Sequence, residues 1–196
     1  LQWLNDFYPE GTSKAQYIPH WQNEDLIKPA QYSQNPFMEK LDLTHQFTVQ
    51  YSGNMGLWND MVSFGKAAGM LQDEMAFVFI GGGIKKPELM NALPEDRKNI
   101  HLLPFQPKEK LGEVLTACHV ALVSLDEGLE GMAVPCKIYG ILAAGVPVVA
   151  LVPETSEIAL VIQEEKCGYV IPPGDVSGLV FALREMKERT DRQIEM

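Results

Sequence analysis

The sequence predicts an α/β fold, a Rossmann-like doubly wound parallel sheet, preceded by an irregular linker segment. Short apolar stretches alternate with stretches of helical periodicity along most of the chain. The apolar stretches, such as 76–80 and 148–151, carry no polar residue at alternate positions. That pattern is typical of parallel strands covered on both faces. Small residues follow several of these stretches, and ligands of such sheets bind at the carboxyl ends of the strands, where these loops lie.

The compact pattern begins at Phe47. Strands are expected at 47–52, 76–80, 100–103, 120–124, 148–151 and 168–171. Helices are expected at 59–72, 87–93, 108–118, 137–144, 156–164 and 176–188. Prolines and a glycine punctuate residues 1–46, so we interpret that part as an incoming element and a linker, and 47–196 as the folded domain. The charged tail 187–196 reads as a helix end or a cut point.

Composition narrows the class of protein. The chain has 196 residues, 46% of them hydrophobic and 21% charged, which is enough for a core. The net charge of −10 argues against a nucleic-acid surface. Three cysteines without a CxxC pair favour neither zinc nor a disulfide framework, and a reducing cytosol fits best. No apolar run approaches a membrane span and no signal peptide opens the chain, which starts at Leu1 and which we expect to be a fragment.

The segment 129–150 is the most informative of the chain. Gly131 permits close backbone approach to a ligand, and Pro135 suits the first position of a helix. Lys137 then lies in the first helical turn, where its charge opposes the helix dipole. A bound phosphate would reverse that balance, because the free amides and the ammonium would both face it. We therefore predict an anion site for a nucleotide diphosphate, against the alternative of an ordinary surface lysine.

Other candidates surround this segment. The glycines of Gly53-Asn54-Met55-Gly56 either meet a phosphate or sugar or form a plain tight turn. The run 81–83 either approaches a nucleotide or accommodates a neighbouring loop. Among the nearby glutamates, Glu157 is favoured as a hydroxyl acceptor because Thr155-Ser156 can cap the helix that begins there. The four histidines have no metal-ligand spacing, and no catalytic residue is assigned.

Three motifs together resemble the C-terminal half of a GT-B glycosyltransferase, closest to the family-4 retaining enzymes of bacterial surface polysaccharide synthesis. They are Tyr51–Gly56, Phe79–Gly83 and Gly131–Val149, and within the last, Val134–Gly145 with Pro147 resembles a subgroup pattern VPSKxYxxLAAGxP. Cys167-Gly168 and Pro173-Gly174-Asp175 also match the downstream pattern of the family. The resemblance covers about three quarters of the chain.

The resemblance implies a single GT-B lobe that binds a nucleotide sugar, most simply a UDP-sugar, without a metal or other cofactor. It places Gly53, Asn54 and Gly56 near the diphosphate or sugar, Lys137 on the phosphates, and Glu157 near the ribose or a phosphate. The remaining donor-binding candidates frame the uridine or line the pocket: Gly81, Gly82, Leu103, Phe105, Glu130, Gly131 and Met132.

The resemblance also implies that residues 1–46, with Ile18-Pro19-His20, are the end of an acceptor-binding lobe and the interdomain linker. The missing lobe would take a saccharide or lipid-linked acceptor, so we expect this fragment alone to be inactive. The full-length enzyme would transfer a hexosyl or N-acetylhexosaminyl group with retention. It would be cytoplasmic, with attachment at the inner face of the membrane as an option.

Two departures from the family pattern stand out. A glutamate pair that many members carry falls at Met132 and Gly140, with Glu130 as a replacement for the first, and the usual basic residue after the first glycine loop is replaced by Leu57-Trp58. Lys137 would then carry more of the phosphate charge. Two other functions remain open: a sugar-nucleotide epimerase of the same architecture, and a nucleotide-binding module without catalysis.

Overall fold

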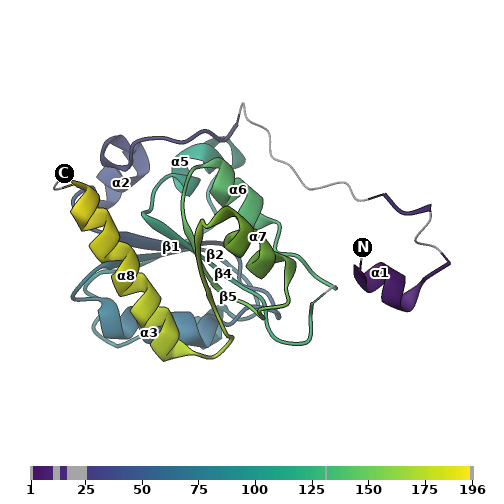
Figure 1. Ribbon diagram of the computed structural model, residues 1–196. Coiled ribbons are helices and arrows are strands. Elements are labelled where there is room, and N and C mark those ends of the chain that lie inside the picture. The colour runs from purple at the N-terminus through teal and green to yellow at the C-terminus, as the bar shows by residue number, and fades with distance from the viewer. Residues whose placement is uncertain (1, 11–13, 17–25, 131, 195–196) are drawn as a thin grey trace.

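The computed structural model describes residues 2–10, 14–16, 26–130 and 132–194 and shows one six-stranded parallel sheet (Figure 1). The strand order is β3-β2-β1-β4-β5-β6, and every adjacent pair is parallel. The strands are β1 (Thr48–Asn54), β2 (Ala76–Gly82), β3 (Ile100–Leu103), β4 (Val120–Ser124), β5 (Val148–Leu151) and β6 (Gly168–Ile171). The predicted doubly wound fold is confirmed, and all six strands lie where the apolar stretches predict them.

Helices cover both faces of the sheet, as fully apolar strands require. One face packs against α3 (Met61–Leu71), α4 (Lys86–Ala92) and α8 (Val176–Ile194). The other face packs against α2 (Pro36–Leu41) and α5 (Leu111–Leu115) at one end of the strand order, and against α6 (Lys137–Ala143) and α7 (Glu157–Glu165) at the other. Alternate residues of one strand serve the two faces: Val49 and Tyr51 join the first core, whereas the Gln50 amide donates to the Val114 carbonyl on the second.

The described residues of the segment 1–46 are more regular than the sequence predicts. They include α1 (Gln2–Phe7), a short 3₁₀ helix η2 (Tyr32–Gln34) and α2. Asn35 caps α2 by accepting from the amides of Phe37 and Met38, and Pro36 occupies the first turn. Phe37 and Met38 are buried against β2. The prediction of an irregular segment is therefore wrong for 32–41, because an Asn-Pro start signal and two buried side chains form a real helix there.

Three boundaries also differ from prediction. The expected helix at 108–118 is a 3₁₀ turn, η3 (Lys108–Lys110), followed by α5, which ends where the Thr116 hydroxyl bonds back to the Gly112 carbonyl. Pro135 lies before the first helical position, because α6 begins at Lys137 with Cys136 as its cap. The charged tail continues α8 as far as Ile194.

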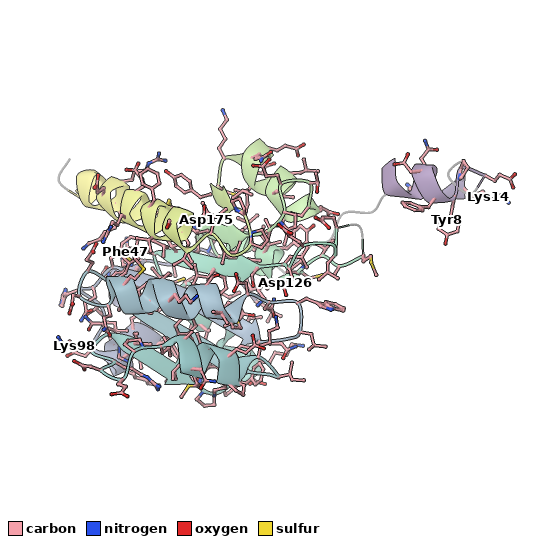
Figure 2. All side chains as sticks on the ribbon, turned by 90° about the horizontal axis from the view of Figure 1, so that it is seen from below. Tyr8, Lys14, Phe47, Lys98, Asp126 and Asp175 are labelled. Atoms are coloured by element: carbon pink, nitrogen blue, oxygen red, sulfur yellow. The ribbon has the colours of Figure 1, made fainter. Side chains whose placement is uncertain are left out.

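The carboxyl ends of the strands form one edge of the sheet. Figure 2 shows Asp126, which follows β4, at the opposite end of the sheet from Phe47, which precedes β1. The strand order reverses between β1 and β4, so the loops after these strands diverge at this edge. Open α/β sheets bind their ligands at such a switch point.

Candidate functional site

Two cavities open at the carboxyl edge, and Lys137 lines both. The larger cavity, of about 630 Å³, lies between the loop after β1 and residues 133–135. The smaller cavity, of about 290 Å³, lies between the end of β1, the segment 105–108 and helix α5. Lys137, the first residue of α6, therefore marks the junction of the two.

The ammonium group of Lys137 is held in an unusual environment. Its Nζ atom is buried and has no hydrogen-bond partner among the described residues, although the residue as a whole is only half-buried. It lies 3.9 Å from the centroid of the Tyr51 ring, an arrangement in which the ring face stabilises the cation. Burial lowers the pKa of Lys137 from 10.5 to about 8, because a charge loses hydration there. A buried cation without an anion is costly, and a bound anion would remove that cost.

Gly53 makes room for this lysine. Its φ of +134° lies in a region that favours glycine, and a Cβ at this position would lie 3.1 Å from Lys137 Nζ. The glycine is thus explained by the close approach of the lysine rather than by a plain turn alone. Gly53 and Asn54 belong to the end of β1 rather than to the loop after it.

The loop after β1 is fixed by Asn59. The Asn59 Oδ1 accepts from the Gly56 amide at 2.9 Å and from the Tyr51 hydroxyl at 3.2 Å, and its Nδ2 donates to the Ser124 carbonyl at 3.1 Å. One side chain thereby joins the ends of β1 and β4 across the switch point. Burial also raises the pKa of Tyr51, so its hydroxyl remains a neutral donor.

The glycine run 81–83 is explained by neighbouring backbone. A Cβ on Gly81 would collide with the Gly53 carbonyl oxygen, and one on Gly83 would collide with the Met55 carbonyl oxygen. Gly82 lies beside the ring of Phe105, 3.8 Å from where its Cβ would be. These contacts favour the neighbouring-loop interpretation for Gly81 and Gly83.

The structure brings five of the predicted donor-binding residues to the cavities. Asn54 and Gly56 line the larger cavity, Gly53 and Phe105 the smaller one, and Lys137 both. Gly81, Gly82, Leu103, Glu130, Met132 and Glu157 line neither cavity, and Gly131 lies outside the described residues. Met132 is 75% exposed, and Glu157 accepts a hydrogen bond from the Tyr139 hydroxyl at 2.9 Å. Their roles as donor-binding residues stay predictions.

Several lining residues are not among the predicted donor-binding residues. Trp58, Asn59 and Ile84 line the larger cavity, and Ile27 lines the smaller one. Asn59, which the sequence predicts as the first residue of a helix close to a glycine loop, could have been noticed as a loop-fixing amide, because α3 begins only at Met61. Ile27 could not have been found, because it lines the same cavity as Lys137 from a segment 110 residues away in the sequence.

Within the described residues, no group of three or more His, Cys, Asp or Glu side chains could hold a metal ion. In the same part of the chain, no helix has the length and apolar character that crossing a membrane requires.

Residues 46–188 match the sequence profile of the family described as glycosyl transferases group 1. The chain belongs to this family. A curated relative, "Probable glycosyltransferase WbjE" of Pseudomonas aeruginosa, is 30% identical over 178 residues. That match covers 88% of this group 1 glycosyltransferase chain and 44% of the relative, so the chain spans less than half of the relative's length.

Two solved structures share the fold. HepE of Anabaena in complex with UDP-glucose superposes with a TM-score of 0.70 at 14% identity, over 90% of this chain and 48% of HepE. The C-terminal domain of the group 1 glycosyltransferase LpcC of Francisella tularensis superposes with a TM-score of 0.67 at 16% identity, over 85% of this chain and 88% of that domain. The group 1 glycosyltransferase chain therefore has the fold of known domains of this class.

Proposed function

We propose that this chain is the donor-binding lobe of a glycosyltransferase that uses a nucleoside diphosphate sugar, most simply a UDP-sugar. The observation that carries the proposal is the buried Nζ of Lys137, which has no hydrogen-bond partner among the described residues and lies between two cavities at the switch point of the sheet. A donor of this class consists of a nucleoside, a diphosphate and a sugar in that order. A cation between two cavities matches that order, because the diphosphate lies between the nucleoside and the sugar.

The smaller cavity is the better place for the nucleoside. The ring of Phe105 lies at its wall with Pro107 and Leu111, and such apolar surfaces accept the flat face of a base. The diphosphate would then lie against Lys137, and the sugar would occupy the larger cavity. HepE, which shares the fold, binds UDP-glucose, and this relative supports the choice of a nucleotide sugar.

The chemistry required of this chain is stabilisation of the leaving group. Cleavage of the bond between the sugar and the diphosphate places negative charge on the β-phosphate. A preorganised ammonium in a site of low dielectric stabilises that charge without reorganisation. Lys137 is held in such a position before the ligand arrives, by the Tyr51 ring and by the space that Gly53 leaves.

Transfer also needs an acceptor. The chain spans 44% of the length of its curated relative, and we place the acceptor site in a second lobe outside it. The acceptor would be a saccharide or a lipid-linked saccharide of surface polysaccharide synthesis. On this proposal the present chain binds the donor, turns it over only together with that lobe, and needs no metal.

Titration calorimetry of the chain with UDP and with GDP tests the proposal. We expect UDP to bind, and Lys137→Ala to weaken binding by about 1.5–3 kcal/mol, the usual cost of losing a charged hydrogen bond. Lys66→Ala on the exposed side of α3 removes an equal charge away from the cavities and should bind as the parent does. Binding of neither nucleotide, or unchanged binding by Lys137→Ala, would contradict the proposal.

A further inference from the structure

The larger cavity has a mostly apolar wall. Leu57, Trp58, Ile84, Leu125, Val134 and Pro135 line it. Leu57, Trp58 and Ile84 are more than half exposed, at 62%, 55% and 68%, so their side chains are available to a ligand at the mouth of the cavity. Leu125, by contrast, is buried at the base of the loop after β4.

The polar groups of this cavity are largely occupied. The Asn59 side chain uses both its oxygen and its amide nitrogen to fix the loops, through Gly56, Tyr51 and Ser124. Lys137 is committed to the diphosphate on the function proposed above. The Asn54 amide and the single indole N–H of Trp58 are then the remaining polar side-chain groups of the lining, and an amide pairs well with another amide or with one or two hydroxyls.

A hexose with all its hydroxyls would fit this wall poorly. A hydroxyl that loses water without gaining a hydrogen bond carries a penalty, whereas a methyl group buried against aliphatic side chains gains hydrophobic stabilisation. The cavity therefore favours a sugar in which some hydroxyls are replaced. Loss of a hydroxyl to give a methyl group and conversion of another to an acetamido group are the two changes that this lining suits.

We infer that the donor carries an N-acylated deoxy sugar, with its methyl groups against Ile84 and Val134 and its acetamido group within reach of Asn54. This inference rests on the proposed function, since it takes Lys137 as the diphosphate contact. It makes the apolar residues after β2 and before α6 the determinants of sugar specificity.

Calorimetry with four probes of one nucleotide tests the inference: UDP, UDP-glucose, UDP-N-acetylglucosamine and UDP-N-acetyl-6-deoxyglucosamine. Each buried methyl group should improve affinity by about four-fold. UDP-N-acetyl-6-deoxyglucosamine should therefore bind at least ten-fold more tightly than UDP-glucose, with UDP-N-acetylglucosamine between them.

Val134→Asn should reduce that preference, the ratio of the affinities for the deoxy sugar nucleotide and UDP-glucose, to about three-fold or less. Leu160→Asn, at an apolar residue on α7 that is 49% exposed and lines neither cavity, is the matched control and should keep the full preference. Thermal unfolding of both variants checks that they fold. If UDP binds and UDP-glucose binds as tightly as the deoxy sugar, the inference fails and the proposed function stands. If UDP itself does not bind, the proposed function fails and the inference with it.

Discussion

A neutral, hydrogen-bonded cluster at the amino end of the sheet contrasts with a charged group at the carboxyl end that has no hydrogen-bond partner among the described residues. At the amino end, the Tyr32 hydroxyl lies within hydrogen-bond distance of the carbonyls of Leu43 and Gln46, at 2.7 and 2.8 Å, and of Thr48 Oγ1 at 2.8 Å. His119 accepts from the Thr48 amide at 3.1 Å, and its ring packs against those of Tyr32 and Phe47. Burial raises the pKa of Tyr32 to about 12, so this hydroxyl stays neutral and paired.

At the carboxyl end, a charged group is buried without such a partner. Lys137 Nζ lies over the ring of Tyr51 and beside Gly53, which has no side chain. The same lysine lines both cavities. Buried polar atoms in native proteins are nearly always hydrogen-bonded, and exceptions need an explanation. The hydrogen-bonded Tyr32–Thr48–His119 cluster therefore contributes to stability, whereas the site of Lys137 loses stability by holding a cation where an anion can bind.

The largest expected effect is a loss of stability on substitution of a buried residue of α2. Met38 is fully buried against β2, so Met38→Ala should lower the free energy of unfolding by about 2–5 kcal/mol. Lys40→Ala, at an exposed residue of the same helix, should change it by less than about 0.5 kcal/mol. Urea unfolding measures both. The folded Met38→Ala protein should bind UDP as tightly as the parent does. A loss of UDP affinity together with the loss of stability would contradict the separation of stability from ligand binding.

The second largest expected effect is an increase in the free energy of unfolding. Lys137→Met removes a buried charge and should raise the free energy of unfolding at pH 7 by up to about 3 kcal/mol, the value of the gap between a pKa of about 8 and the usual 10.5. The same variant should lose UDP affinity. A variant less stable than the parent at pH 7 would show that the lysine stabilises the fold instead.

The pH dependence of that difference follows from linkage. Below pH 8 the lysine is protonated in both states, and the full cost of burying the charge is present. Between pH 8 and 10.5 the unfolded chain holds the proton and the folded chain does not, so the parent gains stability as pH rises. Above 10.5 both states are neutral, and the advantage of Lys137→Met should vanish in urea titrations across this range.

A smaller effect is expected at the cap of α2. Asn35→Ala removes the acceptor of two helix amides and the donor to Glu113 O at 2.8 Å and Thr116 Oγ1 at 3.0 Å. We expect a loss of about 2 kcal/mol in urea unfolding. Gln34→Ala, one residue earlier and exposed, is the control. Equal stabilities of the two variants would mean that the cap contributes nothing.

The smallest effect is expected from a surface ion pair at the carboxyl edge. Lys85 Nζ lies 3.2 Å from Asp126 Oδ2, with side-chain exposures of 20% and 36%. Asp126→Asn should change the free energy of unfolding by less than about 1 kcal/mol, because solvent screens such pairs. A double-mutant cycle with Lys85→Met isolates the pair. A coupling free energy well above about 1 kcal/mol would show that the carboxyl edge, which we assign to ligand binding, also contains a stabilising ion pair.

The sequence predicts the sheet well and the site in part. The strands follow from their apolar stretches, and Lys137 is recognisable because a lysine in a first helical turn has no stabilising reason to be there. The pair Asn35-Pro36 is a start signal for the helix α2, but the many prolines of the segment 1–46 favour an irregular linker instead. The meeting of Ile27, Phe105 and Lys137 around one cavity depends on long-range packing, for which a single sequence holds no local pattern.

The pKa of Lys137, measured by NMR through its Cε signal and assigned with the help of Lys137→Arg, tests most directly whether this lysine binds the diphosphate. We predict a pKa of about 8 in the free chain, and an upward shift when UDP is present at saturation, because the diphosphate favours the ammonium form. An unchanged pKa with UDP bound would place the diphosphate elsewhere and contradict the central claim.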